Sequence, residues 1–192
     1  AAHSVRAAGI KDTESATHGD DASLVSITAT YPFPGFEVVQ FNLAVLSHYS
    51  YILASGNEAM VVDPDRDIDA YLAWAKTRGV KITSVFLSHS NADFVAGHTE
   101  LVKATGCVIH QSALSGAGYS THAVKDGDTL VFGQARITFL NTPGHTPDGT
   151  CAVVASASTP GKPAVMFSGD ALFVGSVGRP DLMGGTMAAS TL

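Results

Sequence analysis

The sequence predicts an α+β fold in which β-sheets pack face to face and helices cover them from outside. Short runs of apolar and β-branched residues arrive along the chain in groups, and amphipathic helical stretches separate only some of these groups. A regular doubly wound sheet would instead alternate strand and helix throughout. The chain has 192 residues, of which 45% are hydrophobic and 15% charged, which is enough to bury a core of this kind.

The first 22 residues differ in composition from the rest of the chain. They are small, polar and mixed in charge, with neither a helical nor a strand period, so we expect a flexible arm over residues 1–22. One domain is expected over residues 23–192. No apolar stretch follows the opening AAHSVRAAG, so no intact signal peptide is predicted, and no run approaches the roughly 20 apolar residues that span a membrane.

Apolar periodicity and turn residues predict the elements of the domain in order. Apolar residues recur at helical spacing over Ile68–Arg78, where Gly79 follows as a stop, and a shorter helix is expected over Gly97–Thr105. Short β-branched and aromatic runs bounded by Gly, Asn or Ser predict strands. These strands are expected at Val38–Phe41, Tyr49–Ala54, Ala59–Asp63, Thr83–Ser88, Cys107–His110, Thr129–Phe132, Arg136–Leu140, Cys151–Ala155 and Ala164–Ser168.

Charge and cysteine content exclude several classes of protein. The net charge is −6 and the 11 basic residues form no run, which argues against a nucleic-acid partner because phosphate binding needs clustered Lys and Arg. Cys107 and Cys151 are far apart and flanked by apolar residues, so we expect two buried thiols rather than a disulfide framework or a zinc ribbon. Free thiols lean toward a reducing compartment, and a cytoplasmic or mitochondrial location is favoured.

Three predicted strands share one design, in which the strand delivers a polar side chain just past its C-terminal end. His89 follows the strand in VFLSHSNADF, His145 follows the strand and the Pro-Gly turn in FLNTPGHTPD, and Asp170 follows the strand in VMFSGDALF. Rigid strands and tight turns hold ligands with little conformational freedom, as a preorganised metal site requires.

Two imidazoles and a carboxylate are a ligand set with more than one chemical use. They hold iron(II) in mononuclear non-haem oxygenases with open positions for substrate and dioxygen, and they also serve a catalytic zinc ion with its bound water. Each imidazole must be neutral to bind, so such a site is expected to lose its metal well below about pH 6.5. Taken singly, a strand-end His and an Asp in a turn also have structural explanations, and residue types and spacing leave both interpretations open.

Several motifs resemble those of a known family. The segment SHSNADFVAGHTEL, beginning at Ser88, is similar to the T-H-x-H-x-D-H signature of the metallo-β-lactamase superfamily. TPGHTPD resembles the second histidine motif of that superfamily, and SGDALF resembles its bridging aspartate motif. GSVGRPDL (Gly175–Leu182), LSHYSYIL (Leu46–Leu53) and ADF (Ala92–Phe94) are similar to persulfide dioxygenases, particularly those fused to a rhodanese domain. The resemblance covers about Val38 to Leu182.

This resemblance implies an αββα sandwich with a metal site at one edge of its two sheets. In the dioxygenase branch two His and one Asp hold a single iron ion, and these map onto His89, His145 and Asp170. Such enzymes oxidise glutathione persulfide with dioxygen to sulfite and glutathione. The implied cofactor is one Fe(II) per chain, with zinc as the alternative, and the implied partner is a small thiol persulfide. A homo-oligomer and an attached rhodanese domain are further expectations.

The sequence departs from the family pattern at two positions. Phe94 stands where two-metal members have a ligating His, and a phenyl ring cannot bind metal, so a second metal ion is not expected. Asn91 stands where the family usually has His; in the dioxygenase branch that His lies beside the metal without ligating it, so the site can survive. Asn cannot act as a general base at neutral pH. Asp93 is expected to orient a ligand without binding the ion.

Other residues are weaker candidates for the substrate cleft. Arg179 could pair with a carboxylate of glutathione or brace its own loop through Asp181, and His48 and Tyr49 could rim the cleft. Two other functions remain open: a hydrolase of the glyoxalase II type acting on a glutathione thioester, and a non-catalytic relative that serves as a scaffold or subunit. Family members usually continue past G-R-P-D-L with a further helix and strand, so we expect the domain to be incomplete at its C-terminal end.

Overall fold

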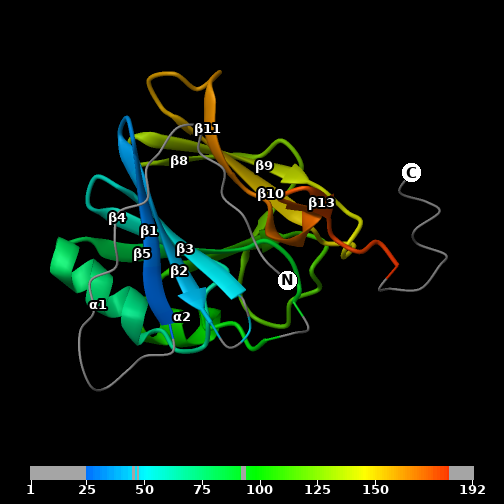
Figure 1. Cartoon of the computed structure of the whole chain (residues 1–192), viewed down its shortest axis with the longest axis horizontal. Coiled ribbons are helices and arrows are strands. Elements are labelled where there is room, and N and C mark those ends of the chain that lie inside the picture. Colours follow the sequence, from blue (N-terminus) through cyan, green and yellow to red (C-terminus); the bar gives the residue numbers. More distant parts are fainter. Residues whose placement is uncertain (1–24, 45, 47, 92–93, 182–192) are drawn as a thin grey trace.

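The computed structural model describes residues 25–44, 46, 48–91 and 94–181, which form two stacked sheets with two α-helices (Figure 1). The larger sheet has seven strands, ordered as they occur in the sequence. Its first four strands are antiparallel neighbours, and the pairs from β4 to β7 are parallel. The strands are β1 (Val25–Phe33), β2 (Phe36–Leu43), β3 (His48–Ser55), β4 (Glu58–Val62), β5 (Lys81–Leu87), β6 (Val108–Ser112) and β7 (His122–Val124).

The smaller sheet has four antiparallel strands in the order β11-β10-β9-β8. A short 3-10 helix, η1 (Gly169–Ala171), and a hairpin of β12 (Leu172–Phe173) and β13 (Ser176–Val177) follow it. The strands of the sheet are β8 (Thr129–Phe132), β9 (Ala135–Asn141), β10 (Thr150–Ser156) and β11 (Pro163–Phe167). The short hairpin of β12 and β13 thus follows the last strand of the smaller sheet, after η1.

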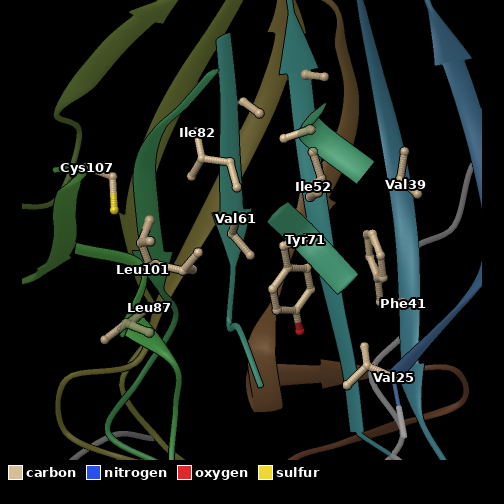
Figure 2. Close-up of a cluster of buried hydrophobic side chains, with 14 of the residues drawn as sticks. Val25, Val39, Phe41, Ile52, Val61, Tyr71, Ile82, Leu87, Leu101 and Cys107 are labelled. Carbon is tan, nitrogen blue, oxygen red and sulfur yellow. The ribbon is translucent and has the colours of Figure 1, made fainter. Parts of the chain in front are cut away.

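Both faces of the larger sheet are buried, because successive side chains along its strands point into two different cores. On one face the strands pack against α1 (Asp69–Arg78) and α2 (His98–Thr105), and Figure 2 shows Tyr71 of α1 beside Phe41 and Ile52 in this cluster. On the other face the neighbouring residues pack against the smaller sheet. Strands buried on both faces are expected to contain continuous apolar runs, as β3 does over residues 51–54 and β4 over residues 59–62.

The core between the two sheets completes the sandwich predicted from the sequence. Phe86 of β5 and Phe139 of β9 are buried with ring centroids 5.3 Å apart, and Tyr51 of β3 lies 5.4 Å from Phe167 of β11. Figure 1 shows α1 and α2 on the side of the larger sheet that faces away from β8–β11. The structure thus confirms the α/β sandwich, and both helices of the described residues lie on the larger sheet.

The predicted elements agree with the structure except where side chains are exposed or the element is very short. Both helices occur where expected and end before Gly79 and Gly106. Strand β1 was not predicted: it is an edge strand, and most of its side chains are exposed or half-buried, so it lacks a clear apolar pattern. Strands β7, β12 and β13 have only two or three residues each.

Two expectations about the whole chain can be compared with the described residues. Cys107 and Cys151 are both buried and free, as predicted, and burial raises the pKa of each thiol. None of the described helices is long and apolar enough to cross a membrane. The predicted N-terminal arm, residues 1–22, and residues 182–192 at the other end lie outside the described residues.

Candidate metal centre

Three strand ends meet at one edge of the sandwich. His89 follows β5 of the larger sheet, whereas His145 follows β9 and Asp170 lies in η1 after β11 of the smaller sheet. Strands β9 and β11 both pair antiparallel with β10, so they run in the same direction and their C-terminal ends share an edge. The site is therefore built by both sheets.

The three side chains lie close enough to hold one ion. One ligand atom from each of His89, His145 and Asp170 lies within 4.8 Å of the other two. The Nε2 atom of His145 is 3.4 Å from Oδ2 of Asp170, and the two imidazole rings are 5.3 Å apart and nearly perpendicular. Bonds of about 2.1 Å at tetrahedral angles put two ligand atoms about 3.4 Å apart, so this separation suits a shared metal ion.

Burial and unused hydrogen-bonding capacity also fit a metal ion. His89 and Asp170 are buried, and the His145 side chain is 18% exposed. Nε2 of His89 is buried and has no hydrogen-bond partner among the described residues. A buried imidazole nitrogen without a partner is costly unless another ligand satisfies it. A void of about 10 Å³ lies among these side chains, and no Lys or Arg lines it. The three residues thus fit a divalent metal.

A hydrogen-bond chain fixes the orientation of His89. Oγ of Ser88 lies 2.9 Å from Nδ1 of His89, which leaves Nε2 as the nitrogen available to a metal. The Ser88 N–H donates to Oδ1 of Asp63 at 2.8 Å, and Asp63 has a positive φ of 46° at the end of β4. Asp63 did not emerge as a site residue from the sequence, although it ends a strand in the same way as the three ligands do.

Two glycines let the ligand segments approach one another. A Cβ atom on Gly178 would lie 1.7 Å from the carbonyl oxygen of Asp170 and 3.2 Å from Cβ of His145. A Cβ atom on Gly169 would lie 2.3 Å from Oγ of Ser88. Any other residue at Gly178 must push the Asp170 backbone aside. Gly178 belongs to the GSVGRPDL motif, so this motif packs its backbone directly against that of Asp170.

A cavity of about 200 Å³ adjoins the ligand cluster, and His89 belongs to its wall. Its wall includes Asn91, Phe94 and His98, together with Gln111, whose Oε1 accepts a hydrogen bond from the Tyr119 hydroxyl at 2.9 Å. Burial lowers the pKa of His98, so its imidazole is neutral at pH 7. Phe94 and Asn91, the two positions at which the sequence departs from the expected family pattern, both line this cavity. No second group of three metal-binding side chains occurs within the described part of the chain.

The remaining predicted residues occupy several different places. Phe94 packs on His48 with ring centroids 4.0 Å apart, and Nε2 of the buried His48 lies 2.9 Å from the Asp63 carbonyl oxygen. Tyr49 is half-buried against the core between the sheets. Arg179 is exposed and forms an ion pair with Asp181 at 2.8 Å. The structure brings neither Tyr49 nor Arg179 to the ligand cluster, and their contact with substrate stays a prediction.

Asp93 lies outside the described residues, so its expected orienting role also stays a prediction. Sequence reasoning missed Asp148, Gly178 and His98. The motif that contains Gly178 was recognised, but its close packing against Asp170 was not predicted. Asp148 lies between Pro and Gly, where an Asp is typical of an ordinary turn. His98 lies within the segment SHSNADFVAGHTEL, but the resemblance gave no role to that position.

Comparisons with known proteins agree with this geometry. The family model described as the metallo-beta-lactamase superfamily matches residues 43–190. A hydroxyacylglutathione hydrolase of Polaromonas sp. strain JS666 is 32% identical over 137 residues, which cover 69% of this chain and 50% of that protein. A metallo-beta-lactamase structure from Staphylococcus aureus subsp. aureus COL is 32% identical with a TM-score of 0.75, covering 82% of this chain and 50% of that one.

The structure of ETHE1 from Myxococcus xanthus is also similar, with 27% identity and a TM-score of 0.64 over 73% of this chain and 60% of that one. The chain spans about half the length of the curated relatives it matches. The match to the family model covers most of the chain and includes His89, His145 and Asp170. The chain therefore belongs to the metallo-β-lactamase superfamily.

Proposed function

We propose that this chain forms the catalytic metal site of an iron-dependent persulfide dioxygenase that oxidises glutathione persulfide. The reaction balances as GSSH + O₂ + H₂O → GSH + H₂SO₃, in which the outer sulfur of the persulfide is oxidised and dioxygen is reduced. The observation that carries the proposal is the ligand set of two His and one Asp, together with Phe94 at a second-metal position. Similarity to persulfide dioxygenase motifs and to the ETHE1 structure supports the same branch.

The protein groups have distinct tasks in this proposal. His89, His145 and Asp170 would hold the ion, and iron(II) in such a set supplies open positions for the persulfide sulfur and dioxygen. Ser88 fixes the His89 ring, so that the ligand geometry does not have to reorganise when the substrate binds. The apolar ring of Phe94 keeps a second ion and its activated water away from the site.

The cavity beside His89 is the place where we expect the thiol part of the substrate to lie. At about 200 Å³ it is smaller than pockets that enclose a whole drug-sized ligand, so it would hold only the portion next to the sulfur. Its polar side chains include the neutral His98 and Gln111. Hydrogen-bonding groups of this kind suit the amide groups that flank the cysteine of glutathione.

A second candidate function is hydrolysis of a glutathione thioester. The hydroxyacylglutathione hydrolases among the relatives of this chain favour it. The same ligands would then hold zinc, and a metal-bound water would be the nucleophile. Phe94 gives this alternative less support than the dioxygenase, because a phenyl ring cannot bind a second ion that would help to activate water.

Oxygen uptake and metal analysis on the same preparation separate the candidates. The dioxygenase proposal expects iron-dependent oxygen consumption with glutathione persulfide, sulfite as product, and no turnover of S-lactoylglutathione. Zinc-dependent thioester hydrolysis without oxygen consumption would replace it with the second function. A folded protein that retains all three ligands but binds neither metal at neutral pH would instead indicate a non-catalytic relative.

A further inference from the structure

Hydrogen bonds from a second segment hold the backbone on both sides of His89. On the N-terminal side, the Thr150 N–H donates to the Ser88 carbonyl oxygen at 2.8 Å. On the C-terminal side, Ser90 donates twice to Oδ2 of Asp148, from its N–H at 2.9 Å and from its hydroxyl at 2.6 Å. The ligand His89 is therefore pinned between two anchored neighbours.

The anchoring segment belongs to the loop that carries the second imidazole ligand. Asp148 lies three residues after His145, in a turn closed by the Thr142 N–H, which donates to the Gly149 carbonyl oxygen at 2.8 Å. The Thr150 hydroxyl donates to the Asp148 carbonyl oxygen at 3.1 Å and ties this turn to the start of β10. A bond to Asp148 is thus a bond between the two His loops.

Asp148 is only 4% exposed, and no Lys, Arg or His of the described residues forms an ion pair with it. Such deep burial is unusual for a carboxylate without a charged partner. A buried carboxylate must be hydrogen-bonded to be tolerated, and bonds to an ionised acceptor are shorter and stronger than neutral ones. The hydroxyl bond to Ser90 is short, as expected for such an acceptor. This short hydrogen bond holds Ser90, the residue that directly follows His89.

We propose that Asp148 is a positioning residue of the metal centre. Its carboxylate locks the His89 loop onto the His145 loop, so that the two imidazoles stand at a metal-binding separation before an ion arrives. The inference rests on the metal site of the proposed function but not on the reaction catalysed there. Groups that orient metal ligands from behind typically change metal affinity by about 10- to 100-fold when removed.

Four variants separate positioning from general stabilisation of the fold. Asp148→Leu removes both acceptor oxygens at similar size, whereas Asp148→Asn keeps one carbonyl oxygen that can accept from Ser90. Asp128→Leu is the matched control, because Asp128 is an exposed carboxylate that accepts from a backbone N–H, that of Lys125, at 2.9 Å. Ser90→Ala removes the hydroxyl donor alone and serves if Asp148→Leu does not fold.

The first readout is the Zn²⁺ dissociation constant of the folded protein, measured by competition with a chelator. We expect Asp148→Leu to raise it at least about tenfold, Ser90→Ala to raise it less, and Asp148→Asn to restore most of the wild-type value. Asp128→Leu should leave it unchanged. If Asp148→Leu lowered the unfolding free energy equally with and without Zn²⁺ and left the dissociation constant at the wild-type value, the positioning role would be overturned.

The second readout is hydrogen exchange of the Ser90 amide in the metal-free protein. The proposal expects a protected Ser90 amide in the wild type and in Asp128→Leu, and rapid exchange in Asp148→Leu. A Ser90 amide that stays protected in Asp148→Leu would contradict it. A wild-type protein that bound neither Zn²⁺ nor Fe²⁺ would end the proposed function, while this exchange experiment would still decide whether Asp148 joins the two loops.

Discussion

Nε2 of His145 lies 3.4 Å from Oδ2 of Asp170, although a whole β-hairpin separates the two residues in sequence. The distance follows from the topology of the smaller sheet, because β9 and β11 flank β10 and end at the same edge. His89 reaches the same edge from the larger sheet. The two sheets must therefore be correctly stacked for the three ligand atoms to meet.

Removing a ligand should remove the metal. We expect Asp170→Ala and His145→Ala to lose stoichiometric Fe²⁺ or Zn²⁺, because two remaining ligands hold a divalent ion far more weakly than three. Elemental analysis after dialysis measures this loss. Asn91→His should keep one ion per chain, and His122→Ala, which replaces an exposed imidazole outside the cluster, is the control. Full metal retention in both ligand variants would disprove the assignment.

Gly178→Ala should damage the metal site while leaving the rest of the sandwich folded. The new Cβ atom would lie 1.7 Å from the Asp170 carbonyl oxygen, a distance that no relaxed structure tolerates, so the Asp170 backbone must move. Metal content should fall while the circular dichroism spectrum keeps its wild-type shape. Gly118→Ala meets open space and should behave as wild type, whereas equal metal content in the two variants would count against the close packing.

The buried His110 should make stability depend on pH. Burial, and to a lesser extent His122 opposite it, lowers the pKa of His110 to about 4, whereas an unfolded His titrates near 6.5. As pH falls from 6.5 toward 4, His110 binds a proton in the unfolded chain before it does so in the folded protein. The unfolding free energy is therefore highest above pH 6.5 and decreases as the pH falls below that value.

Urea unfolding of the metal-free protein at pH 7.5 and at pH 5 measures this effect. Between these two pH values, protonation of His110 in the unfolded chain lowers the unfolding free energy by about 2 kcal/mol. His110→Leu should therefore lose about 2 kcal/mol less than the wild type on acidification. An identical loss in both proteins would mean that the folded His110 takes up its proton near the ordinary pKa.

The hydroxyl of Tyr71 should stabilise the core between α1 and the larger sheet. It lies 2.6 Å from Oγ of Ser50 and accepts a hydrogen bond from the Asp65 N–H at 2.9 Å, in a fully buried position. Tyr71→Phe leaves these two groups without their partner, so the unfolding free energy should fall by about 1–3 kcal/mol. Urea denaturation measures it. The half-buried Tyr49 is the control, and a Tyr71→Phe loss no larger than that of Tyr49→Phe would refute the role.

The sequence allowed prediction of those features that depend on local pattern. The two helices, their glycine stops and the strands that carry His89, His145 and Asp170 all follow from apolar periodicity and turn residues. Strand β1 escaped prediction because an exposed edge strand needs no apolar alternation. Local pattern thus predicts the strands that lead to His89, His145 and Asp170, whereas the assignment of these residues as metal ligands came from the family resemblance.

The contacts that support the ligands could not be predicted, because they join residues far apart in the chain. Asp148 accepts from Ser90 and Asp63 accepts from the Ser88 N–H only once the sheets have stacked. In the sequence each is an Asp beside Pro or Gly, which is typical of any turn. Likewise, the close contact of Gly178 with Asp170 becomes visible only in three dimensions.

Anomalous diffraction from crystals of the iron-loaded protein, collected at the iron edge, would show whether His89, His145 and Asp170 bind a single metal ion. We expect a single peak about 2.1 Å from one atom of each of the three side chains, with no second peak beside Phe94. A peak elsewhere, a pair of peaks, or three ligand side chains that share no peak would contradict this expectation.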